Sequence, residues 1–217
     1  MSTIKDFNIQ GKRVLIRVDF NVPLNSDLLI TDDTRIQAAL PTINHILSNG
    51  GSVVLMSHLG RPKTGPEAKF SLSSLVKHLT ICLSLDVKFV DDCISDQAFE
   101  MSSNLKAGEV LLLENLRFYP QEKKGDAAFA EQLAKHGEFY VNDAFGTAHR
   151  AHASTSVIAN YFEGNKSFGL LMNKELENLQ KVVEGPKKPF TAVIGGAKVS
   201  SKISIIENLL PKISSLI

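Results

Sequence analysis

The sequence contains little of what would build a disulfide scaffold or a membrane anchor. Its 217 residues include no tryptophan and only two cysteines, Cys82 and Cys93. Two cysteines cannot form a disulfide framework or a cysteine-rich metal site, and we expect both to be buried, reduced thiols. The apolar runs are too short to span a bilayer, and the charged first 30 residues lack the apolar core of a signal peptide. We therefore expect a cytoplasmic protein with no membrane partner.

An excess of charge of one sign is also absent. Charged residues make up 22% of the chain, and the formal net charge is +1. No basic tract occurs, and Lys123-Lys124 and Lys187-Lys188 are only pairs. A balanced surface gives no electrostatic reason to bind nucleic acid.

Several catalytic signatures are missing as well. The segment Gly60-Arg61-Pro62-Lys63-Thr64-Gly65 has the glycine spacing of a P-loop, but Pro66 stands where that motif requires lysine. Neither a G-x-S-x-G elbow nor a G-x-G-x-x-G fingerprint is present. His149 and His152 have the spacing of metal ligands, but Arg150 lies between them. We expect these histidines to bind an anion or the backbone, and we expect no metal site in the chain.

Short apolar runs alternate with helical patterns along the chain. The runs are Val14–Val18, Ser52–Met56, Val87–Val90, Val110–Leu113, Phe139–Val141 and Thr191–Ile194. Nearly continuous apolar runs suit strands that are buried on both faces. Helices are predicted from about Asp33 to Leu47 with a kink or break at Pro41, from Ser71 to about Leu83, and after an N-cap at Asp126. The alternation predicts an α/β fold: a parallel, Rossmann-like sheet with helices on both faces.

A domain boundary is predicted between about Gly169 and Pro189. Residues 173–183 read as one helix with acidic residues in its first turn, and Gly185-Pro186 would end it. A new strand then begins near Phe190. We expect a domain at 1–170, a connector at 171–188, and a truncated second α/β domain at 189–217. One more helix of the same domain fits the pattern almost as well.

The distribution of arginine is the most informative feature of the chain. Only six of its 24 basic residues are arginine, so lysine supplies the ordinary solvated surface. Five of the six lie within or just after predicted strands, among polar residues and glycines: Arg17, Arg35, Arg61, Arg117 and Arg150. Ligands of open parallel sheets bind at the carboxyl ends of the strands, and arginine binds phosphate and carboxylate through two parallel hydrogen bonds. The five together predict a site for a small, multiply charged anion.

Each arginine could instead pair with a nearby acid. Arg17 could pair with Asp19, Arg35 with Asp32 or Asp33, and Arg117 with Glu114. For a single arginine this alternative is the better one. For five arginines at corresponding points of successive units, we favour the anion site.

A second candidate site follows the last predicted strand. Gly195-Gly196 lead into a predicted helix that carries Lys198 and Lys202. Glycines allow backbone amides to approach a phosphate, and the start of a helix attracts anions. The two lysines, four residues apart, could reach the same phosphates, although a strand–glycine–helix turn is also an ordinary connection.

Taken in order, these segments resemble phosphoglycerate kinase. The resemblance rests on Arg17–Pro23, Ser57–Pro62, Glu114–Phe118, Asp143–Ser154 and Gly195–Ser200, and covers essentially the whole chain. It implies phosphoryl transfer between MgATP and the carboxylate of 3-phosphoglycerate, giving MgADP and 1,3-bisphosphoglycerate, by a monomer. Family members are longer and carry a second domain, in which we expect the magnesium ligands.

The resemblance also implies residue roles. The acceptor site would comprise Asp19, Asn21, Arg35, His58, Leu59, Gly60, Arg61, Arg117, His149, Arg150 and His152. Arg35 and Lys198 would stabilise the transition state, and Gly195, Gly196, Lys198 and Lys202 would contact the nucleotide. The alternative is a free-standing anion-binding module without catalysis, for which the Gly195–Lys202 turn would have no use.

Overall fold

The computed structural model describes residues 3–63, 65–184, 187–195 and 203–217. These residues divide into two compact units, Met1–Asn173 and Lys174–Ile217. Helix α6, Leu170–Glu184, begins in the first unit and continues into the second. Among the described residues, no helix is both long and apolar enough to cross a membrane.

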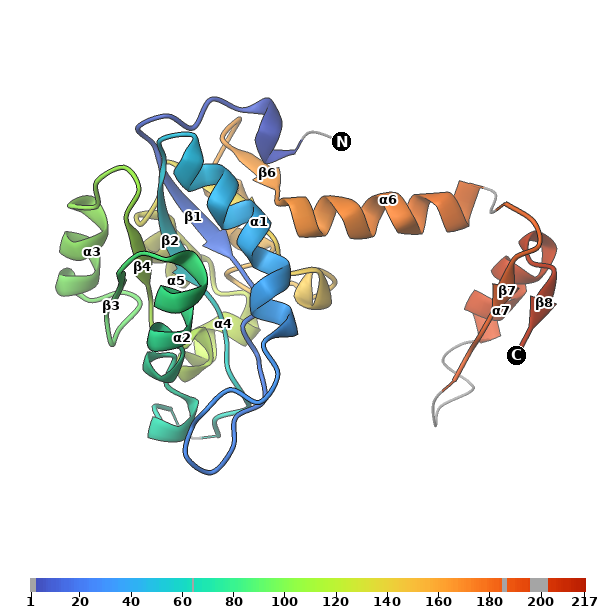
Figure 1. Cartoon of the computed structure of the whole chain (residues 1–217), viewed down its shortest axis with the longest axis horizontal. Coiled ribbons are helices and arrows are strands. Elements are labelled where there is room, and N and C mark those ends of the chain that lie inside the picture. The colour runs from blue at the N-terminus through green and yellow to red at the C-terminus, as the bar shows by residue number, and fades with distance from the viewer. Residues whose placement is uncertain (1–2, 64, 185–186, 196–202) are drawn as a thin grey trace. The chain divides into compact units, whose positions relative to one another are not determined.

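The first unit is built on a six-stranded, fully parallel sheet (Figure 1). Its strand order is β3-β4-β2-β1-β5-β6. The strands are β1 Arg13–Arg17, β2 Ser52–Met56, β3 Val87–Phe89, β4 Val110–Leu112, β5 Phe139–Asn142 and β6 Lys166–Phe168. The sequence predicted the first five, but β6 is short and mostly exposed, so it lacks the apolar run that marks the others.

Helices cover both faces of this sheet, as the sequence predicted. They are α1 Thr34–Ser48, α2 Ser73–Leu83, α3 Asp96–Ser103, α4 Pro120–Lys124 and α5 Ala127–Ala134. Successive strand side chains point to opposite faces. Val14 and Ile16 of β1 therefore join one core with α1 and α2, while Leu15 joins a second core with α3 and α5.

Local signals define some helix ends well. The Asp126 carboxylate accepts a hydrogen bond from the Phe129 amide and caps α5, as predicted. The sequence predicted a kink or a break of the helix at Pro41. A break does not occur, because α1 continues through this residue. Pro41 and Gln37, whose carbonyl loses its helical donor there, both lie on the exposed side of α1, where water can replace the missing bond.

The start of α6 differs from the prediction. The helix begins at Leu170, three residues before the expected start, so the acids near residue 175 are not in its first turn. Its first amides are satisfied by distant side chains: Leu170 N donates to Thr42 Oγ1 and Met172 N to Asp143 Oδ1. No sequence-local cap marks this end, because tertiary partners replace it.

In the second unit, the described residues after α6 form only short elements. Strands β7 Thr191–Ala192 and β8 Ser215–Leu216 pair in parallel, and α7 spans Ile203–Leu209. The strand expected to reach Ile194 thus ends at Ala192, and its partner β8 was not predicted. Val193, Ile203, Ile205 and Ile217 are exposed, so the described part of this unit leaves much of its apolar surface in contact with water.

Candidate functional site

Polar loops follow the carboxyl ends of the four central strands β4, β2, β1 and β5. These loops, with the start of α1 and the end of α4, line a cavity of about 470 Å³. It is lined by Asp19, Asn21, Arg35, His58, Arg61, Arg117, Lys123, Gly146, Thr147 and Arg150. We call this cavity the arginine cup. Seven of its lining residues are predicted acceptor-site residues, although 131 positions separate the first from the last.

Positive charge dominates the cup. Four arginines and Lys123 face a single carboxylate, that of Asp19. Burial, and then the neighbouring Arg150, Arg17 and Arg61, lower the pKa of Arg117. Cations that raise one another's energy in this way favour a bound anion, because it removes their repulsion.

The arginines do not form the ion pairs with neighbouring acids that the sequence offered as the alternative. Arg35 pairs with Asp19 at 3.0 Å rather than with Asp32 or Asp33. Arg117 donates to the carbonyl oxygen of Gly60 at 2.7 Å. Glu114 accepts instead from the backbone amides of Leu72 and Asn115.

Arg17 differs from the other four arginines. It is only 1% exposed and does not line the cup. It donates to Ser154 Oγ at 2.9 Å, to the carbonyl oxygen of Val18 and to His58 Nδ1 at 3.2 Å. Ser154 Oγ in turn donates to the buried Glu122 carboxylate at 2.6 Å. Arg17 therefore holds the residues beneath the cup in place.

His58 is an uncharged member of the cup. Burial and the adjacent Arg17, Arg117, Arg35 and Arg150 lower its pKa to about 2. Arg17 can only donate, so Nδ1 of His58 accepts and Nε2 carries the hydrogen. His58 can therefore donate a hydrogen bond to an anion but cannot supply a positive charge to it.

This burial predicts an acid sensitivity. The native pKa is depressed, so the folded protein binds fewer protons than the unfolded chain below about pH 6.5, and the free energy of unfolding falls as the pH drops. Between pH 6.5 and 5, His58 should contribute a loss of up to about 2 kcal/mol. In His58→Gln this part of the loss should disappear when urea unfolding is measured at both pH values. The variant should still lose some free energy of unfolding between these pH values, though less than the unaltered chain, because burial also lowers the pKa of His136, to about 4. An unchanged loss in the variant would contradict the assignment.

Two predicted residues support the cup through their backbone. Leu59 is buried in the core and exchanges hydrogen bonds with the Asn115 side chain. Gly60 donates to Asn21 Oδ1 at 2.7 Å and accepts from Arg117, so it links two lining residues. It needs to be glycine because its φ is +61° and a Cβ would collide with the Phe70 ring.

The two candidate histidines lie outside the lining. His149 is exposed beside Arg150, and their Nε2 and Nε atoms are 3.4 Å apart. His152 is half-buried with Nδ1 3.8 Å from Glu122 Oε1. In the described part of the chain, neither histidine belongs to a group of three possible metal ligands.

Lys123, Gly146 and Thr147 line the cup but were not predicted. In the sequence, the Lys123-Lys124 pair resembles ordinary surface lysines. Lys123 lies in the last turn of α4 and lines the cup, and the neighbouring Glu122 is buried and holds this turn in place. Of the predicted nucleotide contacts, Gly195 follows β7, while Gly196, Lys198 and Lys202 lie outside the described residues.

Comparisons with known proteins agree with the resemblance. The family described as phosphoglycerate kinase matches residues 4–217. A phosphoglycerate kinase of Porphyromonas gingivalis is 49% identical over 99% of this chain and 57% of its own length. That of Borrelia hermsii is 54% identical over 98% of this chain and 53% of its own. The chain thus spans about half the length of the curated relatives it matches.

Solved structures of the family have the same fold. A phosphoglycerate kinase from Coxiella burnetii superposes with a TM-score of 0.86 at 38% identity, over 99% of this chain and 53% of that one. The enzyme from Pyrococcus horikoshii gives 0.88 at 33% identity, over 100% and 54%. The family match over almost every residue and the shared fold lead to one conclusion: this chain belongs to the phosphoglycerate kinase family.

Proposed function

We propose that this chain is the acceptor-binding half of a phosphoglycerate kinase. The full enzyme would move a phosphoryl group between MgATP and the carboxylate of 3-phosphoglycerate, giving MgADP and 1,3-bisphosphoglycerate. The arginine cup is the observation that supports this most strongly, because five cations facing one carboxylate suit an acceptor with both a phosphate and a carboxylate.

The chemistry requires little from the acceptor site beyond position and charge. The attacking carboxylate is already ionised at pH 7, so no general base is needed. This suits a cup whose histidine, His58, is held neutral and hydrogen-bonded to Arg17. Cationic side chains would hold the acceptor in line and neutralise the charge on the transferring group.

The residue roles follow from this proposal. Asn21, His58, Arg61, Arg117 and Arg150 would bind the acceptor, with Asp19, Leu59, Gly60, His149 and His152 holding them or completing the site. Arg35 and Lys198 would stabilise the transition state. Lys198 and Lys202, with Gly195 and Gly196, would contact the nucleotide. Magnesium does not fit the cup, whose lining has one carboxylate among five cations, so its ligands would lie in the second domain.

The proposed domains are an acceptor-binding domain at 1–170, a connector at 171–188 and the first strand and helix of a nucleotide-binding domain at 189–217. The boundary between the two compact units, after Asn173, supports a connector here. The full enzyme would be a monomer and would lie in the cytoplasm. The relative from Volvox carteri, described as chloroplastic, shows that location varies in the family.

Calorimetry with 3-phosphoglycerate tests the cup directly. All its residues lie in the first unit, so the 217-residue chain should bind the acid. Arg61→Ala should weaken binding by about 10- to 100-fold, because a hydrogen bond to a charged group contributes about 1.5–3 kcal/mol.

The matched control is Lys63→Ala, which removes the same charge from an exposed residue of the same loop outside the cup. It should bind nearly as well as the unaltered chain. Equal losses in both variants would mean that general charge, not a specific site, attracts the acid. Binding that survives in Arg61→Ala would remove Arg61 from the site. The alternative function, an anion-binding module without catalysis, predicts the same binding and is separated from the kinase by turnover in the full enzyme.

A further inference from the structure

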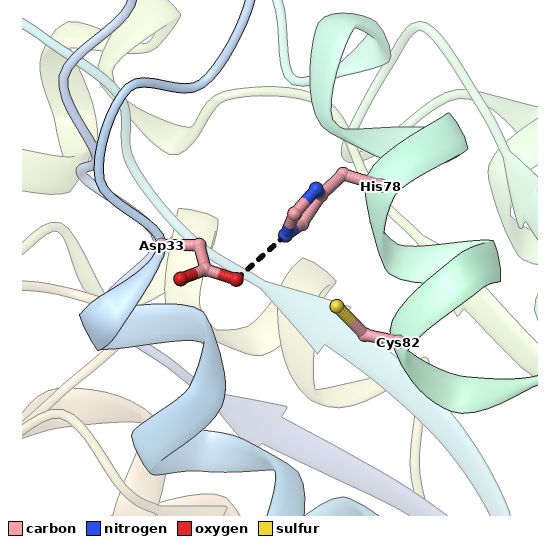
Figure 2. A group of neighbouring side chains, drawn as sticks. All are labelled: Asp33, His78 and Cys82. Carbon is pink, nitrogen blue, oxygen red and sulfur yellow. Dashed lines mark hydrogen bonds and ion pairs between the residues drawn. The ribbon is translucent and has the colours of Figure 1, made fainter.

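Three side chains with different metal-binding atoms meet between α1 and α2, and none of them lines the arginine cup. They are Asp33 at the start of α1, and His78 and Cys82 of α2 (Figure 2). One carboxylate oxygen, one imidazole nitrogen and the thiol sulfur all lie within 4.8 Å of one another. In the part of the chain that the structure describes, no other three histidine, cysteine or acidic residues converge in this way.

The helices hold these ligands in register. His78 and Cys82 are four residues apart, so they lie on the same face of α2. Leu75, Leu79 and Leu83, on the adjoining side of α2, are buried in the core, and α1 is anchored in the same core. Sites on anchored helices keep their geometry better than sites on loops.

The ligand atoms bond only to one another and to Gln37 in the contacts that the described structure gives them. Asp33 occupies the N-cap position of α1 but makes no capping hydrogen bond with its side chain. Its Oδ2 is 2.9 Å from His78 Nε2 and accepts from Gln37 Nε2 at 2.8 Å. These bonds, that from Gln37 first, lower the pKa of Asp33, so the carboxylate is ionised. The N–H hydrogens of Gln37 and His78 therefore point at Asp33 Oδ2, where a bound cation would lie.

Cys82 is the residue that distinguishes a metal site from a simple tie between helices. It was expected to be a buried core residue, but it is half-buried and its thiol faces the cluster, with Gln37 Nε2 3.4 Å from Sγ. The Asp33–His78 pair alone would tie α1 to α2 without any thiol. A half-buried thiol beside an imidazole and a carboxylate is instead accessible to a metal ion from solvent.

We propose that Asp33, His78 and Cys82 bind one zinc ion. Thiolate, imidazole and carboxylate are the three ligand types that zinc takes, whereas calcium and magnesium prefer oxygen alone. One thiolate and one carboxylate balance the two charges of the ion. Three protein ligands leave a fourth position for water.

The required movement is small. Zinc–ligand bonds of about 2.0–2.3 Å in a tetrahedron place ligand atoms about 3.3–3.8 Å apart. The three ligand atoms lie within 4.8 Å of one another, so side-chain rotations that move each atom by about 1 Å reach that spacing. The exposed Gln37 amide can turn out to solvent to make room. On binding, the ion would take the place of the Nε2 hydrogen of His78 and of the thiol hydrogen of Cys82.

The test is titration of the metal-free 217-residue chain with Zn²⁺ against a competing chelator, followed by Co²⁺ as a spectroscopic substitute. We expect one ion per chain, and a thiolate-to-cobalt charge-transfer band in the near ultraviolet. Cys82→Ser should abolish the band, and His78→Gln should weaken Zn²⁺ binding by at least about 100-fold, since even residues that only orient ligands contribute 10- to 100-fold.

Gln37→Ala is the matched control. It removes the hydrogen bonds to Asp33 and Cys82 but keeps all three ligands, so the binding and the band should be retained. Thermal unfolding of each variant without metal checks that all are folded. Absence of the band, its persistence in Cys82→Ser, or equal losses in Gln37→Ala and His78→Gln would overturn the proposal. None of these outcomes depends on whether the arginine cup binds 3-phosphoglycerate.

Discussion

The 217-residue chain alone should convert MgATP and 3-phosphoglycerate no faster than background. Fixing two reactants in register can supply roughly 7–11 kcal/mol of a barrier, and this chain would hold only one of them. Besides the end of α6, the described residues of its second unit form only short elements, and several of their apolar side chains are exposed, which is too little to enclose a nucleotide. Lysines that face water attract phosphate only weakly, because the dielectric constant of water is high. Closure of two domains excludes water from many active sites, and the second unit of this chain is too small to close over the cup.

A coupled assay tests this expectation. The positive control is a chimera in which the chain is completed with the remaining sequence of the Borrelia hermsii relative, which is 54% identical over the shared part. The chimera should turn over, and the chain alone should not, at equal concentrations and with saturating MgATP. Robust turnover by the chain alone would show that the nucleotide site is misplaced.

Arg35→Lys in that chimera should lower kcat by on the order of 10²–10³-fold with a smaller change in the KM for 3-phosphoglycerate. In the described structure Arg35 is held only by its ion pair with Asp19, and its side chain is 52% exposed. Such exposed pairs are weak, so Arg35 can leave Asp19 at little cost when an anion arrives. Lysine keeps the charge but loses the planar pair of donors that would span the oxygens of a transferring phosphoryl group. An interaction made mainly in the transition state appears in kcat rather than in KM.

The control for this substitution is Arg13→Lys. Arg13 begins β1, at the opposite end of the strand from the cup, where it donates to the carbonyl oxygen of His136. It should leave kcat nearly unchanged. A rise in KM alone for Arg35→Lys would make Arg35 a plain binding residue.

The sequence by itself determined the architecture and most of the cup. The apolar runs of β1, β2, β4 and β5 are buried on both faces, so their composition reveals them without any knowledge of their neighbours. The carboxyl ends of parallel strands share one edge of a sheet, so residues as distant as Asp19 and Arg150 could be assigned to one site.

Only the tertiary structure decided which polar residues face the cup and which lie beneath it. Arg17 and Arg61 look alike in the sequence, yet Arg17 lies within β1 and is buried against Ser154, 137 positions away. Lys123 resembles any surface lysine until Glu122 is buried beside it. The meeting of Asp33 with His78 and Cys82 depends on how α1 packs on α2, across 45 or more residues. Periodicity reports the faces of single elements, whereas contacts between elements depend on the shape of the whole core, and no local pattern encodes them.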